Sequence, residues 1–208
     1  MTSPSFSRVI CLRHAEAEIN VQRRFSSEIP GTPLTDLGRE QAAATGLTLV
    51  DEGVAHVYSS PLLRARQTAE IVGAAVNREV TVLVGLREVG LGAREGTPGT
   101  NTEFFQHPAF QAWIRGDTLA PSFEGGETGT DVVSRMRESL DAIADEHIGG
   151  TAAMVSHGGC LVAGLLHLCA NLGYADVERG VPGNGTAIVV ERRDGEWSCL
   201  SWPTVVHH

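Results

Sequence analysis

The chain has 208 residues, a hydrophobic content of 42% and a formal net charge of −9. This length suits one sizeable core, so we expect residues 1–208 to form a single domain. The negative charge disfavours nucleic acid and anionic membranes as main partners. All 16 basic residues are arginine, which excludes a Schiff-base lysine and a P-loop lysine.

The amino-terminal sequence lacks the layout of a signal peptide, and no apolar run is long enough to span a bilayer. These features predict a cytoplasmic protein without membrane association. The four cysteines show no C-x-x-C spacing, so we expect reduced core thiols. His207 and His208 end the chain, and the sequence leaves open whether they belong to a purification tag.

Short apolar segments alternate with longer segments of helical period. This alternation predicts an α/β fold, a three-layer sandwich whose mostly parallel central sheet carries helices on both faces. Thr35 is the expected N-cap of one helix, and Ser60 followed by Pro61 is the expected start of another. In chain order the predicted elements are strand 8–13, helix 35–50, strand 55–59, helix 60–76, helix 128–147, strand 151–156 and a hairpin of strands 185–191 and 197–202.

Residues 90–130 differ in composition from the rest of the chain, because they are rich in Gly, Pro and Thr around a central aromatic segment. The segment is either a satellite core beneath a long connection or a cap that shapes substrate choice, with 97–127 as the candidate cap. Its aromatic residues either line a pocket or serve in packing. They include Phe104, Phe105, Phe110, Trp113 and Phe123.

Arginine or histidine follows three of the predicted strands: Arg13 and His14 after the first, Arg64 shortly after the second, and His157 after 151–156. Open α/β sheets bind ligands beyond the carboxyl ends of their strands, so these residues should converge. Guanidiniums and helix amino termini there favour a phosphate. A guanidinium about 4 Å from a phosphate oxygen contributes roughly 4 kcal/mol at an effective dielectric of 20, so local charge outweighs the net charge.

His14 and Glu16 also spell the His-x-Glu of zinc deaminases, which requires an answering Pro-Cys-x-x-Cys. Cys160 and Cys169 lie nine residues apart, and neither follows a proline. The Gly-x-Ser-x-Gly elbow of serine hydrolases is absent as well. We therefore predict neither a zinc site nor a serine nucleophile.

The stretch "LRHAEAEIN" resembles the Arg-His-Gly-Glu-Thr-x-x-Asn signature of the histidine phosphatase superfamily, the phosphoglycerate-mutase-like enzymes. Further stretches resemble the family's other landmarks in order: "PLTDLGREQA", "VYSSPLLRARQTAEIV", "LREVGLGAREG", "EGGET" and "VSHGG". The resemblance implies that His14 is phosphorylated, that Arg13, Arg64 and His157 hold the transferring group, and that Glu88 donates the proton. It implies no metal and no cofactor.

The residue types suit this chemistry. A neutral imidazole is a covalent nucleophile, and phosphoryl transfer needs alignment and positive charge, which Arg13, Arg64 and a protonated His157 supply. One carboxyl near the leaving oxygen can act as general acid and then as general base. Glu88 matches the motif in position. Three other carboxyls are rivals: Glu16, Glu95 and Glu127.

Asn20 matches the signature's Asn and is expected to contact phosphate or substrate, with ordering of its loop as the alternative. Ser26, or Ser27 beside it, is a candidate phosphate donor. Three positions depart from the family pattern and make the substrate contacts the least predictable part: Ala15, Ala17 and Arg94.

The leading hypothesis is a metal-independent phosphomonoesterase that hydrolyses a small organic phosphate through a phosphohistidine on His14. One alternative is a phosphoglycerate mutase primed by 2,3-bisphosphoglycerate, and another is a non-catalytic relative that only binds phosphate esters. The mutases' long polar insert is not apparent after Glu88, which favours hydrolysis by analogy. The sequence leaves open the substrate and whether the chain forms a homodimer.

Overall fold

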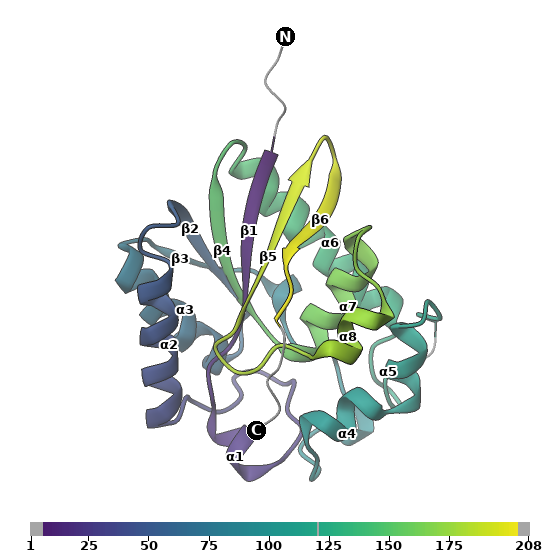
Figure 1. The fold of residues 1–208 in the computed structure, drawn as a ribbon. Helices are drawn as coiled ribbons and strands as arrows, with labels where there is room; N and C mark the ends of the chain where they lie inside the picture. The colour runs from purple at the N-terminus through teal and green to yellow at the C-terminus, as the bar shows by residue number, and fades with distance from the viewer. Residues whose placement is uncertain (1–5, 120, 204–208) are drawn as a thin grey trace.

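A computed structural model of the chain describes residues 6–119 and 121–203. Six strands form one sheet in the order β3-β2-β4-β1-β5-β6, with helices on both faces (Figure 1). The first four strands pair in parallel, and β5 and β6 add an antiparallel hairpin. The predicted mostly parallel α/β sandwich is therefore confirmed. His207 and His208 lie outside the described residues.

The strands are β1 (Phe6–Arg13), β2 (Val54–Ser59), β3 (Val80–Val82), β4 (Thr151–Ser156), β5 (Ala187–Arg193) and β6 (Glu196–Ser201). The helices are α1 (Glu18–Gln22), α2 (Asp36–Thr48), α3 (Leu63–Val76), α4 (Asn101–Gln106), α5 (Pro108–Trp113), α6 (Gly129–Glu146), α7 (Gly158–Leu168) and α8 (Tyr174–Arg179). Two 3-10 turns lie at Val84–Leu86 and Gly92–Arg94.

Alternate residues of β1 face the two outer layers, as the two-residue period of a strand requires. Val9 and Cys11 join the core that includes the inner side chains of α6 and α7. Ile10 and Leu12 join a second core together with apolar side chains of α3. Both faces of the central strand are buried, which explains its continuous apolar sequence.

The observed start of α2 matches the sequence-based prediction, and the observed start of α3 does not. Thr35 is the N-cap of α2, because its hydroxyl accepts a hydrogen bond from the Gly38 amide at 2.9 Å. Helix α3 begins at Leu63 rather than at Ser60 and Pro61. The Ser60 amide still pairs with the β4 carbonyl of Val155 at 2.9 Å, so the chain stays extended beyond β2 before it turns into the helix.

The predicted hairpin between β5 and β6 is confirmed. Its two central residues, Asp194 and Gly195, have φ values of 52° and 86°. Positive φ at both central residues is the geometry of a type I′ turn, which matches the twist of paired strands. The predicted turn at 193–195 therefore has a specific backbone reason.

Residues 97–127 contain α4 and α5 and divide their aromatic side chains between two roles. Phe110 and Trp113 are almost completely buried in the core beside α7. Phe104 and Phe105 are also buried, but they line the cavity described below. The segment is thus both a satellite core and a wall of the cavity.

All four cysteines are buried free thiols, as predicted. Burial raises the pKa of the Cys11 thiol well above its usual value, which favours the inert protonated form. None of the helices in 6–119 and 121–203 combines the length and apolar character needed to cross a bilayer.

Candidate active site

The strand register places two histidines side by side at the carboxyl edge of the sheet. Arg13 of β1 pairs with Ser156 of β4, so the next residues, His14 and His157, are neighbours. Their ring centroids are 5.1 Å apart. The third strand end, just after β2, contributes Ser60, whose hydroxyl lies 2.7 Å from Nε2 of His157. The predicted convergence of the three strand ends is therefore observed.

His14 is held in one tautomer by its own backbone. Its Nδ1 lies 2.8 Å from the Ala15 carbonyl, which can only accept, so Nδ1 carries the proton. Nε2 therefore has its lone pair available, and Nε of Arg64 donates to it at 3.1 Å. Burial, together with the charges of Arg64 and Arg13, lowers the pKa of His14 well below 6.5. The ring is thus a neutral imidazole, the form that a nucleophile needs.

Arg13 and Arg64 are fixed by backbone carbonyls and still have donors to spare. Arg13 donates to the Pro182 carbonyl at 2.8 Å, and Arg64 donates to the Ser26 carbonyl at 2.9 Å. Four buried side-chain nitrogen or oxygen atoms have no partner in the described part of the chain, and three surround His14: Nε of Arg13, Nη1 of Arg64 and Nδ1 of His157. Buried polar atoms without partners are rare and costly, and an anion would satisfy the two guanidinium donors.

His157 differs from the expectation in its charge. Burial, followed by the charge of Arg64, lowers the pKa of His157 well below 6.5, so the neutral ring is favoured in the ligand-free structure. The expected protonated His157 is therefore not the resting state. Bringing in a phosphate would add negative charge beside the ring and favour the protonated form.

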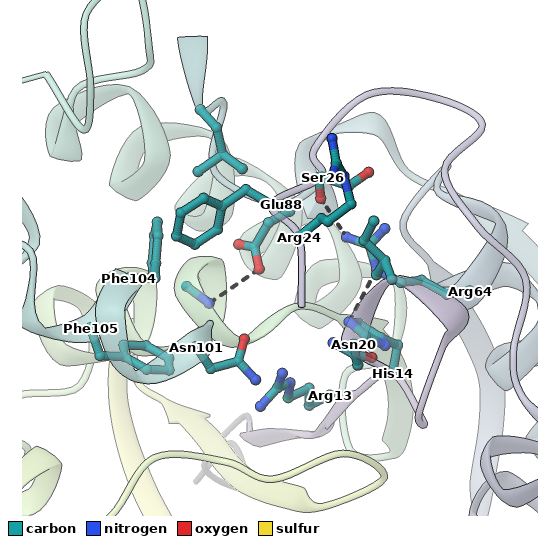
Figure 2. Close-up of a pocket in the computed structure, with 14 residues that line it drawn as sticks. Arg13, His14, Asn20, Arg24, Ser26, Arg64, Glu88, Asn101, Phe104 and Phe105 are labelled. Atoms are coloured by element: carbon teal, nitrogen blue, oxygen red, sulfur yellow. Dashed lines mark hydrogen bonds between the residues drawn. The ribbon is translucent and has the colours of Figure 1, made fainter. Parts of the chain in front are cut away.

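Glu88 lies across the cavity from His14 and Arg64, next to Phe104 (Figure 2). Its carboxylate accepts hydrogen bonds from the amides of Cys160 at 2.9 Å and Gly159 at 3.4 Å, in the first turn of α7. Among the described residues that line this cavity, Glu88 has the single carboxyl group. It therefore faces the nucleophile across the space that a substrate would fill.

The rival carboxyls hold structural positions instead. Glu95 accepts hydrogen bonds from the amide and hydroxyl of Ser27, at 2.8 and 2.7 Å, and Glu16 accepts one from the Thr35 hydroxyl at 2.8 Å. Neither lines the cavity. Within the described ranges, no group of three or more His, Cys, Asp or Glu side chains is placed to hold a metal ion.

Glu127, the third rival, supports the backbone that carries Glu88. It pairs with Arg87 and with Arg135 of α6. Arg135 also donates to the carbonyls of Gly85 at 2.6 Å, Arg87 at 2.7 Å and Glu88 at 3.2 Å. One largely buried guanidinium thus holds three carbonyls of the acid-bearing segment, a positioning role that sequence reasoning missed.

Asn20 and Ser26 both line the cavity, in different ways. The side-chain oxygen of Asn20 accepts from the Ala17 amide at 2.9 Å, so Asn20 also orders its own loop at the start of α1. Ser26 contributes its carbonyl to Arg64, whereas the expectation was a hydroxyl donor to phosphate. The hydroxyl of Ser27, the alternative donor, is directed to Glu95.

The outer part of the cavity includes three residues that the sequence did not single out. Arg24, Phe25 and Asn101 line it together with Phe104 and Phe105. The adjacent arginines of "RRF", which begin three positions after Asn20 of the signature, are a signal that could have indicated Arg24. Asn101, at the start of α4, carries no such signal.

Comparisons with known proteins agree with this geometry. A family model of the histidine phosphatase superfamily (branch 1) matches residues 9–204. The chain belongs to this superfamily. A phosphoglycerate mutase-like protein of Arabidopsis thaliana is 30% identical over 97% of this chain and 87% of its own length. The structure of a mycobacterial glucosyl-3-phosphoglycerate phosphatase superposes with a TM-score of 0.77 at 29% identity, covering 96% of this chain and all of that one.

A protein of Mycobacterium tuberculosis named as bifunctional is 35% identical over 153 residues, 73% of this chain. The chain spans only about two fifths of that relative's length, 41%. Membership of the superfamily confirms the resemblance that the signature stretches indicated.

Proposed function

We propose that this member of the superfamily is a metal-independent phosphomonoesterase that acts on a small organic phosphate. One observation carries the proposal: neutral His14 lies in a buried cluster of unpartnered nitrogens, two of them guanidinium donors of Arg13 and Arg64 and the third Nδ1 of His157. Such a cluster provides an aligned nucleophile and positive charge for the equatorial oxygens of the transferring group. The three nitrogens supply electrostatic stabilisation that a metal ion gives elsewhere.

In the first half-reaction, Nε2 of His14 attacks phosphorus and the bond to the leaving oxygen breaks. Arg64 gives up its hydrogen bond to Nε2 and donates to the phosphate oxygens instead, together with Arg13. Glu88 gives its proton to the leaving alkoxide. The Ala15 carbonyl keeps the Nδ1 proton in place and stabilises the phosphorylated ring.

In the second half-reaction, a water molecule attacks the phosphohistidine from the side that the leaving group has vacated. Glu88, now a carboxylate, accepts the proton of this water. The N–P bond breaks, His14 becomes neutral again, and inorganic phosphate leaves. The position of Glu88 across the cavity from His14 supports both proton transfers.

We also propose that residues 97–127 act as a cap within the single domain, because Phe104 and Phe105, which belong to this segment, line the cavity. A cytoplasmic location belongs to the same proposal and is supported by the four unpaired thiols. Cell fractionation tests it. A homodimer stays a sequence-based expectation.

The names of the relatives favour two activities, hydrolysis and phosphoglycerate mutation. Both begin with phosphorylation of His14, and they differ in the acceptor of the second step. Incubation with 2,3-bisphosphoglycerate and labelled 3-phosphoglycerate separates them: hydrolysis gives inorganic phosphate, and a mutase gives labelled 2-phosphoglycerate. We expect inorganic phosphate as the main product.

The experiment for the proposed function is steady-state hydrolysis of phosphate monoesters in the presence of a chelator. We expect turnover by the wild type and none detectable in His14→Ala. His56→Ala is the matched control, because His56 lies on β2 outside the cavity and should retain full activity. Turnover that survives in His14→Ala, or that the chelator abolishes in the wild type, contradicts the proposal.

A further inference from the structure

A second hollow, of about 590 Å³, adjoins the site cavity and shares part of its lining. Five residues belong to both: Ile19, Asn20, Arg24, Phe25 and Asn101. The remainder comes from Arg23 and from residues 99, 100 and 102, at the start of the candidate cap. A substrate whose phosphate reaches His14 therefore has a continuous path for its leaving group into this outer pocket.

The charge of the two hollows is opposite to that of the whole chain. Four arginines line them, namely Arg13, Arg23, Arg24 and Arg64, against the single carboxyl of Glu88. The whole chain carries a net charge of −9. Positive charge is thus concentrated here, where field lines focus in a concave surface.

The two outer arginines have no carboxylate partner. The ion pairs of the described residues include neither Arg23 nor Arg24. Their backbone is nevertheless pinned, because the Gly99 amide donates to the Arg23 carbonyl at 2.8 Å and the Phe25 amide donates to the Thr97 carbonyl at 2.9 Å. Two unpaired guanidiniums therefore stand on a fixed loop at the exit of the site.

Arg23 also has a left-handed backbone, with φ of 51°. Arg23 is the C-cap of α1, and a left-handed residue at this position ends a helix and redirects the chain. The turn ends α1 and starts the segment that carries Arg24 and Phe25 along the wall of both hollows. This left-handed turn thus places Arg23 and Arg24 further out along the cavity wall than Arg13 and Arg64.

We propose that the outer pocket binds a second anionic group of the substrate, so that the preferred substrates are phosphomonoesters whose leaving group carries a carboxylate or another phosphate. This inference rests on the proposed function. Arg13 and Arg64 serve the phosphate that is cleaved, and the forked guanidiniums of Arg24 and Arg23 suit a carboxylate or phosphate further out. Because both outer arginines are exposed, the preference should weaken as salt rises.

The test compares kcat/KM within pairs of esters that differ in one charge. Phosphoglycolate against 2-hydroxyethyl phosphate probes a carboxylate, and 1,3-propanediol bisphosphate against 3-hydroxypropyl phosphate probes a second phosphate. We expect the more charged member to be preferred by about tenfold or more in at least one pair. The pair with the larger ratio identifies the anion. Ratios near one in both pairs overturn the inference.

Two variants assign the preference to the outer arginines. In Arg24→Gln the ratio should fall to about threefold or less, and in the Arg23→Gln, Arg24→Gln double variant it should approach one. Arg39→Gln is the matched control, since Arg39 is exposed on α2 away from both hollows and should leave the ratio unchanged. A ratio that survives in the double variant overturns the assignment.

Failure of the proposed function has a different signature, because no ester of either pair is then hydrolysed. In that case the same four compounds are compared by calorimetric titration. If the more charged members bind more tightly and the double variant loses this difference, the outer pocket binds an anion although the protein does not hydrolyse these esters. Equal affinities within each pair overturn the pocket as well.

Discussion

The inner half of the site cavity is built from buried side chains at or just after strand ends, whereas the outer half combines exposed polar side chains with buried phenylalanines. Arg13, His14 and Arg64 retain at most 4% of their surface exposed, and backbone carbonyls orient all three. Arg24 and Asn101 are exposed on two segments that meet only through tertiary pairing. The fixed half suits the phosphoryl group, and the more exposed half suits the leaving group.

The largest effect is expected from the inner half. Arg64→Gln removes a guanidinium from both His14 and the phosphate, so kcat should fall on the order of 10³-fold for every substrate. Steady-state kinetics measures this. Arg66→Gln, two residues further on α3 and exposed, is the control and should be unaffected. A loss that depends strongly on the leaving group would break the division between the halves.

Glu88 lies at the border of the halves, so its effect should depend on the leaving group. Glu88→Gln should lower kcat for alkyl phosphates about 10²-fold, because a poor leaving group needs the proton. An aryl phosphate with an acidic phenol needs no proton, and we expect a loss of less than about fivefold in its phosphorylation step. Single-turnover kinetics with both esters measures the difference. Glu138→Gln on the outer surface of α6 is the control, and equal losses with both esters count against Glu88 as the acid.

The histidines of the inner half should make stability depend on pH. In the folded protein the pKa values of His14 and His157 lie below 6.5, so the folded state binds fewer protons than the unfolded state. The free energy of unfolding therefore keeps their full contribution above pH 6.5 and loses it as the pH falls below this value. Thermal unfolding from about pH 7.5 to 5 should show a falling Tm, less steep in His14→Gln, and inorganic phosphate should oppose the fall. An identical slope in wild type and variant contradicts this assignment.

The smallest effect is expected at Arg94, which does not line the cavity but packs against Phe25 of its outer half. Its guanidinium lies over the rings of Phe25 and Phe123, at 5.1 and 5.5 Å from their centroids. Arg94→Ala should cost about 0.5–1 kcal/mol of stability, a Tm shift of roughly 2–4 °C or less, with kcat nearly unchanged. Calorimetry against the exposed control Arg137→Ala measures it. A tenfold loss of kcat would place Arg94 in the phosphoryl-transfer chemistry instead.

The same division explains what the sequence could predict. His14 and His157 were predictable because the carboxyl ends of parallel strands meet at one edge of a sheet, whatever the connections between them. Glu88 follows a 3-10 turn rather than a strand end, so its role came only from the resemblance to the family. The sequence could not show that Arg24 and Asn101 line the same cavity. A backbone hydrogen bond between their two segments, from the Gly99 amide to the Arg23 carbonyl, brings them together.

The helix start predicted at Ser60 and Pro61 was wrong for α3, and tertiary contacts explain why. Ser60 and Pro61 suit the first positions of a helix on local grounds. The Ser60 hydroxyl, however, is engaged by His157, and its amide pairs with β4. Tertiary contacts of Ser60 with His157 and β4 thus outweigh the local preference for a helix start.

Rapid-quench labelling with a ³²P-labelled monoester, followed by peptide mapping, tests whether His14 carries the transferred phosphoryl group. We expect an acid-labile, base-stable label on His14 in the wild type, formed within one turnover and absent in His14→Ala. Turnover without label on His14, or a label on another residue in both proteins, would contradict it.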